Sequence, residues 1–127
     1  MCMMVYIASD RALPTSVWDQ SNPRFHVCDL QKQDDPVRAQ FSKPYIYYVG
    51  SHEGCGCGFQ YGEYDGFEED PVTLAANQTS RRALAAYLTD ALEHQSAIEL
   101  FACWDGDQAA KPEHRENIRP PDLVGRS

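Results

Sequence analysis

The residues best suited to chemistry lie close together in the middle of the chain. His52 is followed within six residues by Cys55 and Cys57, and imidazole and thiolate groups are the ligands that zinc and iron–sulfur centres take from proteins. Two cysteines on one face of an extended strand hold their sulfurs roughly 6.5–7 Å apart, and a turn brings them closer to a single ion. The spacing therefore predicts a zinc or iron site at His52, Cys55 and Cys57.

A structural zinc ion takes four protein ligands, so this site needs a further donor. Cys103 is the expected addition, and Cys28, His26 or a group from a partner chain are the alternatives. The competing interpretation is structural, because Gly56 and Gly58 alternate with the cysteines. Bare backbone of this kind marks a place where another element or a ligand packs closely, and the cysteines then simply pack on a sheet.

The same thiols also suggest a thiol-dependent enzyme, with Cys55 or Cys57 as nucleophile and His52 as the available base. The reactive species is the thiolate, which a nearby cation stabilises. No Lys or Arg occurs between Lys43 and Arg81, whereas six acidic residues do. Such a field disfavours a free thiolate, so the sequence favours metal binding, in which the ion itself stabilises the thiolate.

Charge is distributed unevenly along the chain. Nineteen acids and eleven Lys or Arg residues give a net charge of −8, which argues against a protein that coats nucleic acid or an anionic membrane. Residues 44–80 carry six acids and no Lys or Arg, a net −6. This segment is a candidate docking surface for a basic protein partner, as in an inhibitor or immunity protein. The acidic residues proposed for it are Glu63, Asp65, Glu68, Glu69 and Asp70. The alternative is a solvated acidic loop.

The 127 residues predict a single domain, 1–127, large enough to bury a core without disulfides. The first ten residues lack the basic start of a signal peptide, and no run reaches the ~18 apolar residues of a membrane span. The five cysteines are an odd number, which argues against a disulfide framework. A cytoplasmic protein with reduced thiols is the expectation.

Hydrophobic patterning predicts an α+β fold with a mixed or mainly antiparallel sheet and one main helix on one face. The expected elements are strands at 4–8, 24–30, 44–50, 55–61 and 98–104, a brief helix capped by Asp35 and opened by Pro36, an amphipathic helix from Thr79 or Ser80 to about residue 94, and a short strand near 117–119. Residues 45–50 and 55–61 are expected to pair as a hairpin. The strand at 98–104, apolar on both faces, is expected in the centre of the sheet.

Three segments carry a resemblance to known sequences. Residues 51–59 (SHEGCGCGF), 80–88 (SRRALAAYL) and 99–107 (ELFACWDGD) resemble a group of small uncharacterised bacterial proteins, over about half of the chain. That group has no established activity, so the resemblance implies no mechanism. Separately, residues 55–58 are similar to the Cys-Gly-Cys-Gly tail of A-type iron–sulfur carriers. The tail is C-terminal in that family and is followed by Ser-Phe, whereas here it lies mid-chain and Phe59 follows directly.

Overall fold

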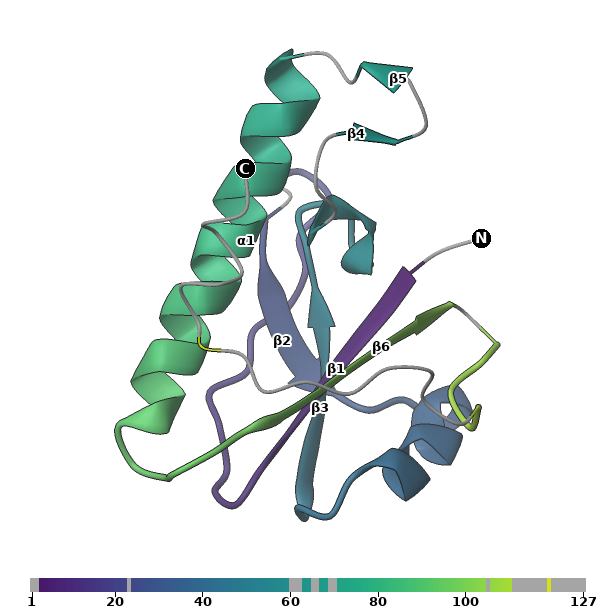
Figure 1. Ribbon diagram of the computed structural model, residues 1–127, viewed down its shortest axis with the longest axis vertical. Coiled ribbons are helices and arrows are strands. Elements are labelled where there is room, and N and C mark those ends of the chain that lie inside the picture. Colours follow the sequence, from purple (N-terminus) through teal and green to yellow (C-terminus); the bar gives the residue numbers. More distant parts are fainter. Residues whose placement is uncertain are drawn as a thin grey trace.

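The computed structural model describes residues 3–22, 24–59, 63–64, 67–68, 71–104, 106–110 and 119. Its elements, in chain order, are β1 (Met3–Ser9), β2 (His26–Asp29), the 3₁₀-helix η1 (Lys32–Gln40), β3 (Tyr45–Gly50), the 3₁₀-helix η2 (Gly56–Phe59), β4 (Glu63–Tyr64), β5 (Phe67–Glu68), α1 (Pro71–Leu92) and β6 (Glu99–Trp104) (Figure 1).

The main sheet has the strand order β2-β3-β1-β6, and every neighbouring pair is antiparallel. The two inner strands are the most apolar segments, because an inner strand is covered on both faces. Val5 of β1 lies opposite Val49 of β3 on one side and Ala102 of β6 on the other. The predicted α+β class, with an antiparallel sheet and one main helix, is confirmed.

The helix α1 covers one face of this sheet (Figure 1). Leu84 and Leu88 of α1 form a buried cluster with Val5, Val27 and Val49, whose side chains point to the α1 side of the sheet while those of their strand neighbours point to the other side. The strand side chains that point toward α1 are therefore buried between the helix and the sheet.

The opposite face of the sheet contacts η1. The sequence predicts that Asp35 caps this helix and Pro36 opens it, which is wrong, since η1 begins four residues before Pro36. The Asp34 carboxylate organises its start: Oδ2 accepts the Gln31 N–H at 3.1 Å, and Oδ1 accepts the Tyr6 hydroxyl at 2.7 Å. The bond to Tyr6 ties η1 to β1, a tertiary contact that local sequence cannot encode.

The main helix begins earlier than expected. A start near Ser80 is predicted, but α1 begins at Pro71, where proline fits the first helical position because its missing N–H would have no partner there. Val72 and Leu74 are exposed, so the first turns lack the apolar stripe that marks a helix in sequence. Ser80 consequently lies buried inside α1 and does not cap it.

The predicted hairpin between 45–50 and 55–61 is wrong. Both edges of β3 are occupied, by β1 and β2, so no edge is left for a third strand. The chain turns sharply after β3 because the Ser51 N–H bonds the Cys55 carbonyl at 2.8 Å and the Gly54 N–H bonds the Ser51 carbonyl at 3.0 Å. Residues 56–59 then form η2, not a strand.

The remaining strand predictions are partly confirmed. β1, β2, β3 and β6 occur where they are expected, but β6 lies at the edge of the sheet and not at its centre. Its side chains alternate between half-buried and exposed, because α1 leaves this strand partly uncovered, and Leu100 and Trp104 are exposed. The strand expected near 117–119 lies outside the described residues, except for Arg119, which has no regular structure.

Candidate metal centre

A buried serine organises the turn between β3 and η2. The Ser51 side chain is fully buried. Its hydroxyl donates to the Cys55 carbonyl at 2.6 Å and accepts the backbone N–H groups of Glu53, at 3.2 Å, and Gly58, at 3.1 Å. One side chain thus replaces the backbone partners that a regular strand would supply, and it fixes the conformation of residues 51–58.

Two aromatic residues hold the outside of the same turn. The Tyr48 hydroxyl donates to the Gly54 carbonyl at 2.8 Å, and Trp18 Nε1 donates to the His52 carbonyl at 3.3 Å. Gly54 has φ 86°, a left-handed conformation that favours glycine. The turn is therefore held from within by Ser51 and from outside by the two rings.

The two glycines of the Cys-Gly-Cys-Gly segment are required by packing. A Cβ on Gly56 would lie 2.7 Å from Val5 Cγ2 and 2.9 Å from the Met3 carbonyl oxygen. A Cβ on Gly58 would meet the Ser51 side chain and lie 2.6 Å from His52 Cε1. The close approach expected of this bare backbone is therefore made by protein: η2 packs against β1 at one glycine and against the turn at the other.

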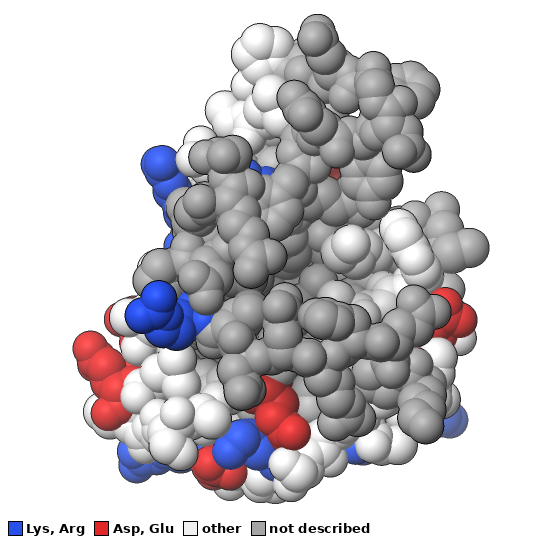
Figure 2. All heavy atoms as spheres, in the orientation of Figure 1, with Lys and Arg blue, Asp and Glu red and all other residues white. Residues whose placement is uncertain are grey.

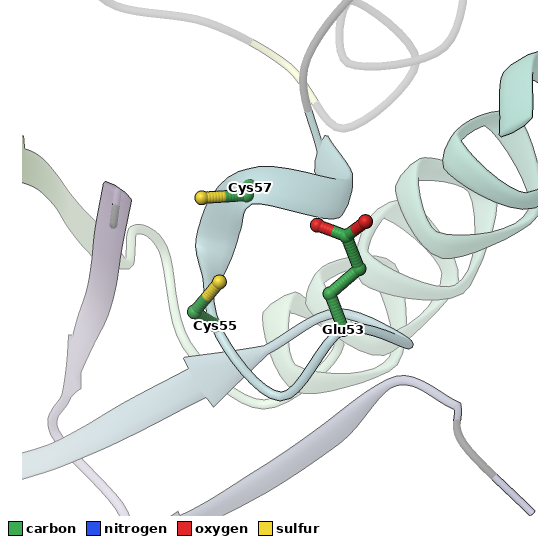
Figure 3. Close-up of side chains that lie close together, drawn as sticks. All are labelled: Glu53, Cys55 and Cys57. Atoms are coloured by element: carbon green, nitrogen blue, oxygen red, sulfur yellow. The ribbon is translucent and has the colours of Figure 1, made fainter. Parts of the chain in front are cut away.

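Three potential ligands converge on this turn. One donor atom each from Glu53, Cys55 and Cys57 lies within 4.8 Å of the other two. Glu53 comes from the turn after β3, whereas the cysteines lie just before and within η2 (Figure 3). Two donors bound to one tetrahedral zinc ion at about 2.0–2.3 Å stand about 3.3–3.8 Å apart, so the three side chains would rotate toward one another to hold an ion. In the described part of the chain, this is the one group of three or more such side chains.

A backbone donor already points at one sulfur. The Met3 N–H, at the start of β1, donates to Cys57 Sγ at 3.2 Å. Backbone donors of this kind orient the sulfur ligands of metal sites. The sequence gives no sign of this contact, because Met3 and Cys57 are 54 residues apart.

Glu53 is the ligand that the sequence interpretation missed. Its position two residues before Cys55 was a usable signal, since a turn places such neighbours side by side. His52 lies outside the group. Its backbone N–H donates to Ser80 Oγ at 3.1 Å, and its Nδ1 lies 2.7 Å from the same oxygen. The imidazole is thus engaged with α1, on the other side of the turn.

Cys103 also lies outside the group. It stands opposite Met4 in the β1–β6 register, so its side chain shares a sheet face with Tyr6 and not with Val5. The glycine backbone of η2 packs against the Val5 side chain, which is on the opposite face. Cys103 and the two clustered cysteines are therefore separated by the thickness of the sheet.

A third thiol can be compared with this group. Cys28 lies on β2, half-buried on the face that η1 contacts. Burial, followed by the negative charges of Asp29 and Asp34, raises the pKa of its thiol, which keeps it protonated near neutral pH. Cys28 is therefore poorly suited to ligation or nucleophilic attack.

The proposed acidic docking surface is only partly described. Glu63 and Glu68 lie opposite each other in the β4–β5 pair, whereas Asp65, Glu69 and Asp70 lie outside the described residues. Among the residues that are coloured by charge in Figure 2, acidic and basic side chains alternate along the lower edge of the visible face. A basic protein partner stays a prediction.

Comparison of the chain with protein-family models, with curated proteins and with solved structures gives no match. The resemblances stated above stay predictions. None of the described helices combines the length and the apolar character that a membrane crossing needs.

Proposed function

We propose that this protein binds one zinc or ferrous ion through Glu53, Cys55 and Cys57. The observation that carries the proposal is the convergence of these three donor atoms within 4.8 Å. Two thiolates and a carboxylate carry three negative charges, more than enough to balance the two positive charges of a divalent cation. Thiolate ligands favour zinc or iron over magnesium or calcium, whose sites are built from oxygen.

The surroundings of the group support this proposal. The Met3 N–H donates to Cys57 Sγ, and the buried Ser51 hydroxyl holds the backbone that carries all three proposed ligands. A site whose backbone is already ordered loses less conformational entropy on binding. Three protein ligands leave one tetrahedral position for water or for a group from a partner, as in zinc sites that are not purely structural.

The proposal includes a cytoplasmic location, where thiols stay reduced. The competing use of Cys55 or Cys57 as a nucleophile requires a base at hydrogen-bond distance. His52 is the nearest candidate in sequence, and its Nδ1 is engaged with Ser80. The geometry therefore supports metal binding better than thiol catalysis.

Metal content is the direct test. Tag-free protein purified without chelator, and the same protein titrated with zinc against a chromophoric chelator, are expected to hold about one equivalent. The double variant Cys55→Ser/Cys57→Ser is expected to lose more than about 100-fold in zinc affinity, since even supporting residues of metal sites contribute 10–100-fold. Cys28→Ser is the matched control and should bind zinc as the wild type does. Less than about a tenth of an equivalent, with no uptake of added zinc, contradicts the proposal, because such sites bind tightly.

The predicted participation of His52 and Cys103 is tested in the same titration. His52→Ala and Cys103→Ser are each expected to leave zinc affinity within about threefold of the wild type if the ion uses only the three clustered ligands. A loss above about tenfold in either variant would add that residue to the ligand set, since a lost ligand costs at least as much as a lost supporting contact.

A further inference from the structure

An open pocket of about 520 Å³ lies on the α1 side of the same turn. Its lining combines Arg24 and Phe25, just before β2, with His52 of the turn. Helix α1 contributes Ala76, Thr79, Ser80 and Ala83. The volume falls within the roughly 300–1,000 Å³ of pockets that bind small molecules.

The apolar part of the pocket combines the Phe25 ring, which is held in place, with small side chains of α1. The Phe25 ring packs edge-to-face on Tyr87, with ring centroids 5.7 Å apart, and on Phe59, at 6.2 Å. These two contacts hold the ring in place, and an aromatic face suits a flat apolar ligand. The lining from α1 includes Ala76 and Ala83, whose small side chains leave space for a ligand.

The polar part is cationic. Arg24 is the charged residue among those that line the pocket. Its side chain is exposed and forms no hydrogen bond or ion pair with any residue in the described part of the chain. The charge of Arg24 contributes to the lowered pKa of the Asp19 carboxyl, after the hydrogen bonds from Ser21. A guanidinium binds a carboxylate through two parallel hydrogen bonds.

His52 supplies a second, oriented polar group. Ser80 Oγ lies 2.7 Å from Nδ1 and also accepts the His52 backbone N–H. Ser80 is buried in the middle of α1, so its role is to position the imidazole and not to attack a substrate. With Nδ1 engaged, Nε2 is the ring nitrogen left for a ligand.

We propose that this pocket binds a small carboxylate with a flat apolar body. The anionic group pairs with Arg24, His52 provides a second polar contact, and the body lies against Phe25. The binding does not depend on the metal, because the lining shares no side chain with Glu53, Cys55 and Cys57. The two proposals can therefore fail separately.

Titration of the full chain with 2-naphthoate, followed by ¹⁵N chemical shifts and by calorimetry, tests the pocket. We expect saturable binding below about 1 mM, with shifts concentrated at residues 24–25, 52 and 76–83. The neutral analogue 2-naphthamide should bind about tenfold more weakly, because it loses the charge-assisted bonds to Arg24. Equal affinity for the two compounds, or no saturable shift at about 5 mM naphthoate, overturns the proposal.

Matched variants locate the site. Arg24→Gln is expected to weaken naphthoate binding about tenfold, whereas Arg82→Gln, an exposed position of α1 outside the lining, should leave it unchanged. Ala83→Phe should fill the pocket and abolish binding, while Ala86→Phe, exposed on α1, keeps it. Circular dichroism of each variant confirms that it folds. Wild-type affinity in both Arg24→Gln and Ala83→Phe contradicts the proposal, and Cys55→Ser/Cys57→Ser should bind naphthoate normally whatever its zinc content.

Discussion

The turn after β3 has two sides that differ in how they are built. On one side, Glu53, Cys55 and Cys57 come from five consecutive residues and form a small, negatively charged group. On the other side, His52 joins residues far from it in sequence around a larger pocket of mainly apolar lining with one arginine. A single turn thus carries the three proposed metal ligands, which are close in sequence, and contributes His52 to the proposed carboxylate pocket, whose lining is far apart in sequence.

The difference follows from the packing of the turn. Glycines at 56 and 58 allow η2 to approach both β1 and the turn itself, so the intervening cysteine is left at a surface. The hydrogen bonds from His52 to Ser80 draw its ring toward α1 and away from the thiols. Because the two sides share a backbone but no side chain, changes to the backbone should affect both, and changes to one set of side chains should affect only one.

The largest expected effect comes from Gly58→Val. The new side chain would collide with Ser51 and His52, and overpacking of this kind costs about 1–3 kcal/mol. Urea denaturation should show that loss of stability, and zinc and naphthoate binding should both weaken. Ala86→Val, on the exposed face of α1, is the control. Wild-type stability and zinc affinity in Gly58→Val would show that the turn is not closely packed.

Ser51→Ala tests the shared backbone more gently. The change removes a donor to the Cys55 carbonyl and the acceptor of the Glu53 N–H, and it leaves the buried Gly58 N–H without its acceptor, which costs about 1–3 kcal/mol. The free energy of unfolding should fall by about 2 kcal/mol, and zinc binding should weaken because Glu53 and Cys55 are no longer held. Ser42→Ala, at an exposed serine, should have neither effect. If Ser51→Ala binds zinc as tightly as the wild type, the Ser51 hydrogen bonds do not contribute to metal binding.

Met3→Pro tests the metal side alone. Proline removes the N–H that donates to Cys57 Sγ and is tolerated at the first residue of a strand. Zinc affinity should fall about tenfold, as for other contacts that support a ligand, while naphthoate binding stays constant. Met3→Leu retains the N–H and serves as the control. If proline and leucine change zinc affinity equally, the hydrogen bond to Cys57 Sγ does not contribute to metal binding.

The smallest expected effect is on how the stability of the protein depends on pH, through the buried His26. His26 is 5% exposed and lies against Gly50, and burial lowers its pKa below 6.5, partly offset by a hydrogen bond with the Arg24 backbone. Because the unfolded chain binds this proton more readily, the contribution of His26 makes the protein less stable as pH falls below about 6.5. In His26→Asn, stability measured in urea should decline less between pH 7 and pH 5 than in the wild type. An equal decline in both proteins contradicts this role.

Some elements of this structure could be predicted from the sequence and others could not, for physical reasons that differ between elements. The apolar runs of β1, β3 and β6 identify strands because burial of one or both faces dictates their composition. The edge position of β6 could not be predicted, since it depends on which strands α1 covers. The start of α1 was missed because its first turns are exposed and carry no apolar stripe.

The candidate site shows the same division. Cys55 and Cys57 were identifiable because a turn brings two thiols at this spacing within reach of one ion. Replacement of the expected strand by η2 depends on the buried Ser51 hydroxyl, and the sheet register decides that Cys103 points to the other face. The pocket was not predicted at all, because its walls come from residues 24–25, 52 and 76–83 and meet only in the folded chain.

X-ray absorption at the zinc edge tests the central claim most directly. The ion in zinc-loaded protein is expected to have two sulfur neighbours at about 2.3 Å, with oxygen or nitrogen at about 2.0–2.2 Å completing the coordination. Those two sulfurs belong to Cys55 and Cys57, so the double serine variant should show none. A zinc ion without sulfur neighbours in the wild-type protein, or with three of them, would contradict the ligand set proposed for this turn.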